Sequence, residues 1–273
     1  MTASPSSTVS EASSGKVDPS LEITRVFSLF RLKVGDSLRL SEEERHHVYK
    51  VLRGRQGDRI EVVDGTGRLF VAELAGKGEA TILKERPVPE GAGGEEVRVT
   101  LYQAVPKGRH MDLVVEKATE LGVMRIVPMT TERGAVKLSE GDGKTRRWRR
   151  VAEAAARQSL QLRVPEVAEV VPFAEAARDA QGIRVLLHNE PGPPALEDVV
   201  ASGGAVGLFV GPEGGWSDAE LAVTREAGLS LASLGPYRLR SETAGIAAVA
   251  RACAVRERAG SLAGSVTRSV GRS

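Results

Sequence analysis

The sequence is poor in several features that would point to particular classes of protein. Its one cysteine, Cys253, cannot form an intramolecular disulfide, which favours a reducing compartment. The 38 Lys and Arg residues nearly balance 36 Asp and Glu, so a net charge of +2 gives no strong overall field for nucleic acid. No apolar run reaches the roughly 18 residues that cross a bilayer, and residues 1–20 lack the apolar core of a secretory signal. We therefore expect a cytoplasmic protein that uses neither a membrane nor a metal.

What is present divides the chain into two parts. Short strand-like runs such as "DRIEVVD" and "RLFVAELA" fill residues 23–86, with Gly and Asp turns between them, which predicts a small β barrel. A helix over Ser41–Leu52 interrupts them, because "SEEE" offers a serine cap and acidic residues for the first turn. The predicted divisions are a disordered tail (1–22), a barrel domain (23–88), a Pro/Gly-rich linker (89–96), a second domain (97–260) and a C-terminal tail (261–273).

From Val97 onward, strand-like and helical segments alternate. Strand-like runs include "VRVTLYQAV", "RIVPM", "IRVLLHN" and "AVGLFV", and helical runs include "MDLVVEKATELG", "SDAELAVTREAG" and "TAGIAAVARACAVRER". This alternation predicts an α/β fold with a parallel sheet covered by helices on both faces. In "KTRRWRRVAEAAARQS", Trp148 and Ala155 share one helical face, so we expect Trp148 in the core and the arginines in solvent or on RNA.

The stretch "VGLFVGPEGGWSDAELA" (206–222) runs from a strand through a glycine-rich turn into a helix. Ligands of open α/β sheets bind outside the carboxyl ends of strands, and glycines let a ligand approach the backbone closely. Ser217 and Glu220 have the spacing of a capping box that opens the helix. The alternative is an ordinary tight turn. The chain contains neither GxxxxGK[ST] nor GxGxxG, which argues against a phosphate loop or a dinucleotide site.

Two further strand ends resemble this one in composition. "VLLHNE" brings His188 and Glu190, and "SLGPYRLRSETAGIAAVA" brings Arg238 and Arg240 before an alanine-rich helix. The three ends together offer backbone polar groups, leucine side chains and few charges. Such a site suits a flat, uncharged ring with a sulfonium or an amine better than a polyphosphate.

Five motifs in the same order resemble one known family. "GPEGGWSDAE" and "LGPYRLRSETA" resemble the two knot motifs of SPOUT-class methyltransferases, specifically those of the ribosomal small subunit methyltransferase E family. "YQAVPKGRHMDLVVEKATELGV", "RWRRVAEAAARQSLQLRVPEV" and "HHVYKVLRGRQGD" resemble further segments of that family. The resemblance covers residues 25 to about 258. One departure is that Tyr237 and Arg238 stand where the family usually has Arg and an aliphatic residue, and Ser241 stands where Thr is common.

The resemblance implies a specific fold and reaction. It implies a SPOUT-type parallel α/β sheet with a C-terminal trefoil knot, preceded by a PUA-like, RNA-binding β barrel. S-adenosylmethionine would bind bent within the knot of a homodimer. The reaction would be methylation of N3 of a uridine in 16S rRNA, at position 1498 by the family's name. Two alternatives stay open: a SPOUT enzyme acting on another RNA position (ribose 2′-O or tRNA), and a non-catalytic RNA-binding module.

The same resemblance selects candidate site residues. Arg240 is the first catalytic candidate, because a guanidinium near O2 or O4 would stabilise the anion left when uridine N3 loses its proton. A surface arginine paired with Glu242 is the alternative. Glu120, Glu242 and His188 are possible bases, among which spacing does not select. The cofactor-binding residues implied by the motifs are Leu187, His188, Gly211, Pro212, Leu234, Gly235, Leu239, Thr243 and Ala244.

Candidate RNA contacts are basic residues of both domains. Those of "PKGRH" stand out, because a basic loop with a glycine beside the cofactor site could clamp an RNA backbone. Each of these charges, taken alone, is more often plain surface. The predicted set is Arg25, His46, Arg53, Lys107, Arg109 and Arg163.

Overall fold

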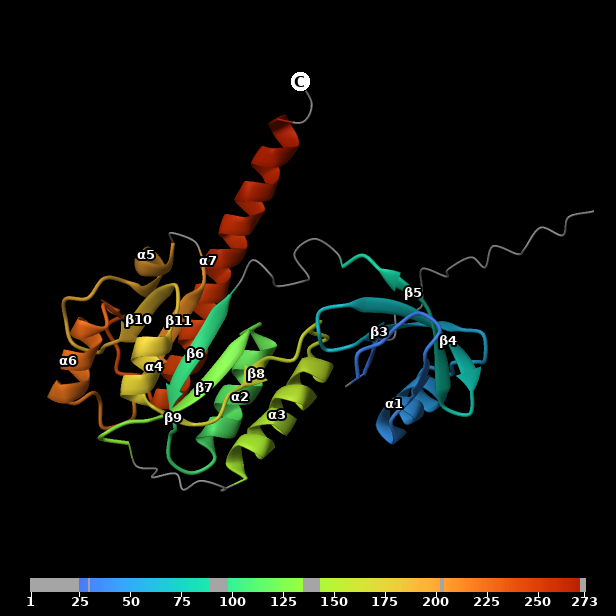
Figure 1. Cartoon of the computed structure of the whole chain (residues 1–273), viewed down its shortest axis with the longest axis horizontal. Coiled ribbons are helices and arrows are strands. Elements are labelled where there is room, and N and C mark those ends of the chain that lie inside the picture. Colours follow the sequence, from blue (N-terminus) through green and yellow to red (C-terminus); the bar gives the residue numbers. More distant parts are fainter. Residues whose placement is uncertain (1–24, 29, 89–97, 135–142, 202–203, 271–273) are drawn as a thin grey trace, which may run out of the picture.

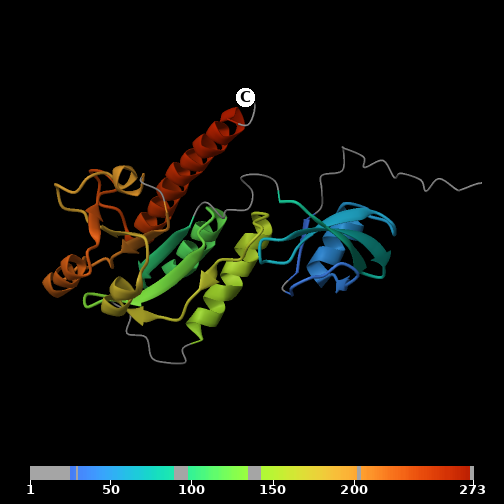
Figure 2. The same cartoon turned by 45° about the horizontal axis from the view of Figure 1, so that its top comes forward.

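The computed structural model describes residues 25–28, 30–88, 98–134, 143–201 and 204–270. Two domains lie side by side, a small curled sheet with one helix and a larger helix-covered sheet, and both views separate them (Figures 1 and 2). The predicted N-terminal tail (1–22) and linker (89–96) lie outside the described residues.

The N-terminal domain is built on one curled, five-stranded sheet in the order β1-β3-β4-β5-β2. Strands β1 and β3 pair in parallel, and the other pairs are antiparallel. The PUA-like architecture predicted for this region is confirmed. Its strands are β1 (Arg25–Phe27), β2 (Ser37–Arg39), β3 (Arg59–Val63), β4 (Leu69–Gly76) and β5 (Glu79–Arg86).

The predicted helix of this domain is present and capped as its sequence indicates. Helix α1 spans Glu42–His46 and continues as a π-helical turn over His47–Val51. Ser41 Oγ accepts the backbone N–H of Glu44 at 3.3 Å, and Glu44 Oε2 accepts the N–H of Ser41 at 2.9 Å. The two bonds form a capping box, which satisfies N–H groups that a helix start leaves unpaired.

The C-terminal domain contains a parallel sheet in the order β12-β10-β11-β6-β7-β8, with β9 beside β7. This confirms the predicted α/β class. The strands are β6 (Val99–Ala104), β7 (Arg125–Thr130), β8 (Glu166–Val167), β9 (Val171–Pro172), β10 (Ile183–Leu187), β11 (Val206–Val210) and β12 (Ser230–Ala232). The helices are α2 (His110–Glu120), α3 (Lys144–Gln158), α4 (Phe173–Asp179), α5 (Leu196–Val200), α6 (Asp218–Glu226) and α7 (Ser241–Val270).

Helices cover both faces of this sheet, as the alternation of segments predicts. Helices α2, α3, α5 and α7 pack on one face through a core that contains Leu101, Leu208 and the predicted core residue Trp148. Helices α4 and α6 cover the other face, where Tyr102 of β6 stacks on Phe209 of β11 with ring centroids 4.2 Å apart. Alternate residues of β6 and β11 therefore belong to opposite cores, as in a strand buried on both sides.

The path of the chain after β12 decides whether it is threaded. Strand β12 lies at the sheet edge, yet α7, which follows it, packs on the inner strands β6 and β11 and against α5. On the way, Ser233 donates its N–H to Pro194 O at 2.8 Å, so the chain runs beside the segment before α5. The chain thus returns from the sheet edge to the sheet centre, and the trefoil knot itself stays a prediction. Helix α7 continues to Val270, beyond the expected domain end at residue 260.

The two domains contact each other through the loop after α3. Leu162 of that loop packs with Phe27, Val63 and Leu69 of the curled sheet. The backbones of the two domains are also hydrogen-bonded, since Gly67 donates its N–H to Leu162 O at 2.9 Å. An apolar cluster and backbone hydrogen bonds thus position the N-terminal domain relative to the larger sheet.

Candidate active site

The carboxyl ends of β10 and β11 are joined by one tryptophan from the glycine-rich turn. Trp216 is buried, and its indole Nε1–H donates to the carbonyl of Leu187 at 3.0 Å. Gly211 lies against the same ring, since a Cβ on Gly211 would lie 2.9 Å from Trp216 Cε2. The turn therefore needs glycine at residue 211 for packing within the protein.

A single hydroxyl connects β6, β11 and the start of α7. Ser241 Oγ donates to Gly211 O at 2.6 Å and accepts from Gln103 Nε2 at 2.9 Å. Gln103, at the end of β6, is fully buried. Gly245 lies beside it, because a Cβ there would come within 2.3 Å of Gln103 Oε1. These contacts fix the first turn of α7 against two central strands.

The glycine turn is held on its other side by the predicted capping box. Ser217 donates its N–H to Glu220 Oε2 at 2.9 Å, and Ser217 Oγ accepts the N–H of Glu220 at 3.2 Å. Glu220 Oε1 also accepts the N–H of Glu132, from the segment after β7, at 2.9 Å. Glu220 is thus a buried connector between two loops at one edge of the sheet.

The structure places the predicted cofactor residues at three strand ends and at the start of α7. Leu187 is buried, and Leu234, Leu239 and Ala244 are half-buried. Gly235 has φ +116°, and its N–H donates to Ser233 Oγ at 3.0 Å. The rest of the predicted set occupies the same edge: His188, Gly211, Pro212 and Thr243.

His188 has a defined local role. Its backbone N–H donates to Ala232 O at 2.9 Å, which extends the pairing of β10 with β12. Its ring Nδ1 accepts the backbone N–H of Glu190 at 3.2 Å. Since an accepting nitrogen carries no proton, neutral His188 has its proton on Nε2.

Arg240 and Glu242 adjoin in sequence but differ in environment. Arg240 is exposed, its carbonyl accepts the N–H of Ala244 at 2.8 Å, and within the described residues its guanidinium has no ion pair or hydrogen bond. Glu242 is only 8% exposed, and its Oε1 lies 3.4 Å from Nδ1 of His110, the first residue of α2. The alternative in which Arg240 pairs with Glu242 is therefore not what the structure shows.

Glu120 is the third residue of the predicted catalytic set. It ends α2, whereas His110 begins that helix, so about 15 Å of helix axis separates Glu120 from Glu242 and its partner. Its carboxylate binds Lys117 Nζ at 2.9 Å. Hydrogen bonds to Glu116 and Glu120 raise the pKa of Lys117. Glu120 is thus an ion-paired residue at the end of α2 opposite His110.

Two of the predicted RNA-binding residues lie beside this site. Lys107 and Arg109 precede α2 and are exposed. The backbone N–H of Lys107 donates to Glu213 Oε1 of the glycine turn at 3.2 Å, so the basic loop and the turn are in contact.

Arg25 and Arg163 lie instead where the two domains meet. Arg25 donates to Glu61 Oε2 at 2.8 Å and to Leu160 O, in the loop after α3, at 2.9 Å. Arg163 lies against Gly67, where a Cβ would come within 2.5 Å of Arg163 Nε. Both guanidinium groups thus help to join the domains.

The remaining two predicted RNA-binding residues, His46 and Arg53, are exposed on the N-terminal domain. Arg53 has φ +58°, a left-handed conformation that costs most residues free energy. It follows the π-helical turn, and both features recur at functional sites.

Sequence reasoning missed His110 and Gln103. His110 belongs to "PKGRH", which was chosen for its charges, and the spacing of residues gives no sign that it meets Glu242. Gln103 reads as one polar residue within a strand, although it contacts Ser241 138 residues later. Contacts between such distant segments follow from topology and leave no local signal.

A parallel α/β sheet with connected loops at its carboxyl edge, joined to a PUA-like sheet, is the architecture of the two-domain SPOUT proteins. Among the described residues, no group of three His, Cys, Asp or Glu side chains is placed to hold a metal ion. In those same residues, no helix has the length and apolar character that crossing a membrane requires.

Comparisons with known proteins agree with this class. Residues 94–253 match the family model described as RNA methyltransferase domain, and residues 40–85 match the one described as RNA methyltransferase PUA domain. The chain is 36% identical over 221 residues to the ribosomal RNA small subunit methyltransferase E of Mycobacterium bovis, a match that covers 76% of this chain and 82% of that protein.

Two solved structures are similar along most of their length. The ribosomal RNA small subunit methyltransferase E of Neisseria gonorrhoeae, bound to S-adenosyl methionine, has a TM-score of 0.69 at 30% identity and covers 84% of this chain and 95% of its own. A Legionella pneumophila methyltransferase in complex with the cofactor SAM has a TM-score of 0.71 at 31% identity and covers 88% of this chain and 98% of its own. The chain belongs to the ribosomal RNA small subunit methyltransferase E family.

Proposed function

We propose that this protein transfers a methyl group from S-adenosylmethionine to N3 of a uridine in 16S rRNA, at position 1498 by family resemblance. Family membership supports the reaction class. One observation of the structure carries the proposal. The ends of β10 and β11 and the start of α7 are fixed to one another by Trp216 and Ser241 at the carboxyl edge of the sheet. Such connected loops provide one rigid site for a small ligand.

The residues at this edge fit the proposed cofactor. Leu234, Leu239 and Ala244 offer half-buried apolar surface for an adenine ring, and loop backbone groups can read its polar edge. Gly235, with φ +116°, permits a close approach to the backbone. When bound, the cofactor would supply a methyl group on a sulfonium.

Arg240 is proposed to stabilise charge on the uridine. Uridine N3 becomes nucleophilic when its proton leaves, and negative charge then spreads onto O2 and O4. A guanidinium without a partner among the described residues is available to donate hydrogen bonds to either oxygen. Its place just before α7 puts it beside the proposed cofactor site.

The proton of uridine N3 needs an acceptor. Of the three possible bases, Glu242 combines burial at this edge with a second titratable partner, His110. Substituting glutamine for Glu242 should lower kcat and remove a step from the pH profile of the rate. An unchanged profile would exclude Glu242 as the acceptor.

The partners complete the proposal. Lys107 and Arg109 would hold rRNA phosphates beside the reacting uridine, because they lie next to the glycine turn. A homodimer and a cytoplasmic location, both implied by the family resemblance, belong to the same proposal. Sedimentation of the pure protein tests the dimer, since a single monomeric species at micromolar concentration would reject it.

The decisive experiment uses rRNA from a strain that lacks the gene. We expect mass spectrometry of its nucleosides to show no N3-methyluridine, and the intact gene to restore it. Arg240→Ala should fail to restore it while binding S-adenosylmethionine with wild-type affinity by calorimetry. Arg238→Ala, which removes a neighbouring exposed arginine, is the matched control and should restore it. N3-methyluridine in the deletion strain would reject the proposed reaction.

Digestion of RNA methylated with labelled cofactor separates the alternatives. Label in a 2′-O-methylnucleoside, or in tRNA alone, would replace N3 of 16S rRNA as the target. No binding of S-adenosylmethionine to the pure protein would favour a non-catalytic RNA-binding module.

A further inference from the structure

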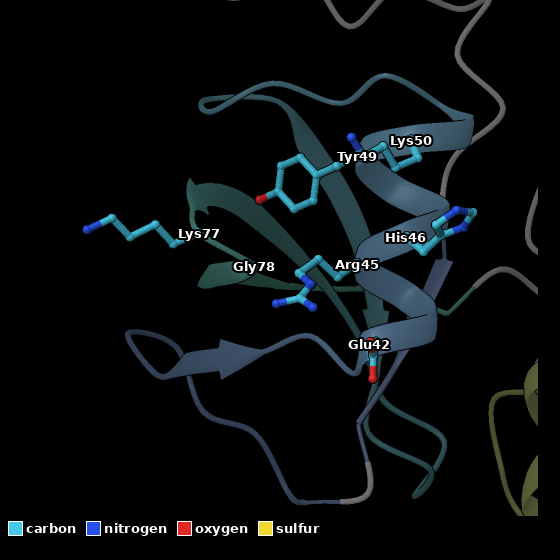
Figure 3. Close-up of a pocket in the computed structure, with 7 residues that line it drawn as sticks. All are labelled: Glu42, Arg45, His46, Tyr49, Lys50, Lys77 and Gly78. Carbon is cyan, nitrogen blue, oxygen red and sulfur yellow. The ribbon is translucent and has the colours of Figure 1, made fainter.

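A second site lies on the N-terminal domain, away from the carboxyl edge of the large sheet. A pocket of about 430 Å³ opens between α1 and the turn that joins β4 to β5. Figure 3 shows Arg45 and Tyr49 extending from α1 toward that turn, with Lys77 directed outward at the far side. This hollow is called the α1 pocket, and the residues that line it are Glu42, Arg45, His46, Tyr49, Lys50, Lys77 and Gly78.

The charges around the α1 pocket are unbalanced. The lining contains three cationic side chains, those of Arg45, Lys50 and Lys77, but only one carboxylate, that of Glu42. Within the described residues, none of these three cations has an ion pair or a side-chain hydrogen bond. Arg68 of the same domain, by contrast, is paired with Glu85 at 2.7 Å. Unpaired cations around one hollow attract an anion.

Tyr49 contributes a polar atom that the protein leaves unused. Its ring lines the pocket and its hydroxyl is buried, yet that hydroxyl has no hydrogen-bond partner among the described residues. Buried hydroxyl groups in native proteins nearly always have a partner, and the exceptions call for an explanation. A ligand oxygen in the pocket would supply the missing partner.

The backbone at Lys77 supports a functional role for this lysine. Lys77 has φ +56° and lies between Gly76 (φ +88°) and Gly78 (φ +83°) in the hairpin turn. Such turns favour Asn, Asp or Gly at this position, because other side chains are strained at positive φ. Strained residues persist mainly where function requires them. Here the strain places a cation at the rim of the pocket.

Arg45 can pack directly on the β4–β5 turn because Gly78 has no side chain. A Cβ on Gly78 would come within 2.8 Å of Arg45 Cδ, so the aliphatic stem of Arg45 lies directly on the turn. Gly78 therefore lets Arg45 pack against the turn that carries Lys77, which lines the rim of the same pocket and is directed outward from it. The Tyr49 side chain extends toward that turn as well.

We propose that the α1 pocket binds one phosphodiester-linked nucleotide of the substrate RNA. Arg45 and Lys77 would contact the phosphate, the Tyr49 hydroxyl would donate to a phosphate or ribose oxygen, and Glu42 would accept from a ribose or base N–H or O–H group. The volume suits a group the size of a nucleotide. The proposal rests on the proposed function, since it assumes an RNA substrate, and it adds a docking site on a different domain from the reacting uridine.

The test compares two variants that spare the fold. Lys77→Asn removes a cation and installs a residue the turn prefers, and Tyr49→Phe removes only the unpartnered hydroxyl. Binding of a fluorescently labelled 16S rRNA fragment that contains the target uridine is measured by anisotropy over a range of salt. We expect affinity to fall about threefold to tenfold in each variant, and the salt slope to decrease by about one for Lys77→Asn only. Thermal stability should stay equal or rise.

Lys33→Asn is the matched control, because Lys33 is an exposed turn lysine of the same domain that does not line the pocket. Wild-type RNA affinity in both pocket variants, or an equal loss in the control, would overturn the proposal. So would inorganic phosphate that raises the melting temperature of wild type but not of Lys77→Asn while RNA binding is unaffected, because the pocket would then hold a free anion.

Calorimetry with S-adenosylmethionine and methylation at saturating RNA separate the two hypotheses. Unchanged cofactor binding and kcat with weaker RNA binding support the pocket. Intact methylation with unaltered RNA affinity rejects the pocket and leaves the proposed function standing. A wild-type protein that neither binds the cofactor nor methylates the RNA rejects the proposed function, and the pocket proposal with it.

Discussion

At the scale of single residues, the hydroxyl of Ser241 connects three elements of the fold. It accepts from buried Gln103 and donates to Gly211 O, so it connects β6, β11 and α7. Ser241→Ala would remove the donor to Gly211 O and leave Gln103 Nε2 with only its bond to Ala104 O at 3.1 Å. We expect a loss of about 1–3 kcal/mol in the free energy of unfolding, measured by urea denaturation, because each buried group left unpaired is costly.

Ser241→Thr is the control for that prediction. Threonine retains the hydroxyl, and its extra methyl group is the only added volume. The threonine variant should keep most of the stability and bind S-adenosylmethionine more tightly than the alanine variant does. Equal losses in the two variants would show that packing, not the hydroxyl, determines the stability at residue 241.

Gly211 provides a second test at this scale. In Gly211→Ala, the new methyl group would lie 2.9 Å from the Trp216 ring and push it from the Leu187 carbonyl. We expect a loss of about 1–3 kcal/mol by urea denaturation, as for other overpacked sites. Gly122→Ala is the comparison, because a Cβ there meets nothing within 4 Å and only its φ of +85° opposes alanine. A smaller loss at Gly211 than at Gly122 would contradict the prediction.

Residue-scale prediction from sequence succeeded where a local pattern exists. The Ser217–Glu220 capping box is confirmed, because a cap depends on spacing within one turn. The place of Glu120 at the far end of α2 from His110 was not predicted, because its motif shows a carboxylate near a basic residue but not which end of the helix faces the site. The pairing of His110 with Glu242 depends on two helix starts meeting in space.

At the scale of elements, periodicity predicts most strands and helices of the C-terminal domain. Long segments such as α3 repeat their apolar residues many times, so the pattern is clear. Helix α5 and strand β9 are too short for a repeat, and neither was predicted. The order of the strands in the sheet depends on long-range packing, which the pattern of a single segment does not contain.

An ion pair between α5 and α7 gives an element-scale prediction. Glu197 accepts hydrogen bonds from Arg251, and these lower the pKa of the Glu197 carboxyl from 4.5. A lowered folded-state pKa stabilises the fold above the unfolded value, and this contribution disappears as pH falls through the folded-state pKa. Glu197→Gln should thus cost at most about 1 kcal/mol at pH 7, because both side chains are partly exposed.

The difference between wild type and Glu197→Gln should close as the pH falls below about 4.5, the ordinary value for this carboxyl. Urea denaturation across pH 3 to 7 measures it. Asp198→Asn is the control, since Asp198 is an exposed carboxylate on the same helix without an ion pair among the described residues. A gap that stays constant with pH would mean that the ion pair does not stabilise the contact of α5 with α7.

At the scale of the whole molecule, the contact between the two domains relates the proposed docking pocket to the proposed reaction site. The contact combines an apolar cluster around Leu162, a backbone bond from Gly67, and Arg25 reaching Leu160 O. From the sequence, Arg25 and Arg163 are predicted as RNA ligands. Their positions at this contact show why charge alone does not separate an RNA-binding arginine from one that joins domains.

Leu162→Ala tests whether this contact serves function as well as stability. Leu162 is 3% exposed and packs on the curled sheet, so its truncation leaves a cavity between the domains and should cost about 2–4 kcal/mol. The loops at the carboxyl edge belong to other elements. Affinity for S-adenosylmethionine, measured by calorimetry at 25 °C, should therefore stay within about twofold of wild type, a change of less than about 0.5 kcal/mol in binding free energy.

The KM for rRNA should rise in Leu162→Ala, because an RNA that both domains bind requires a fixed orientation of one domain relative to the other. Leu113→Ala removes a leucine that is 41% exposed on α2 and should change neither quantity. If Leu162→Ala lowers stability but leaves the KM for rRNA at the wild-type value, the two domains bind RNA independently of each other. The contact between them then serves stability alone.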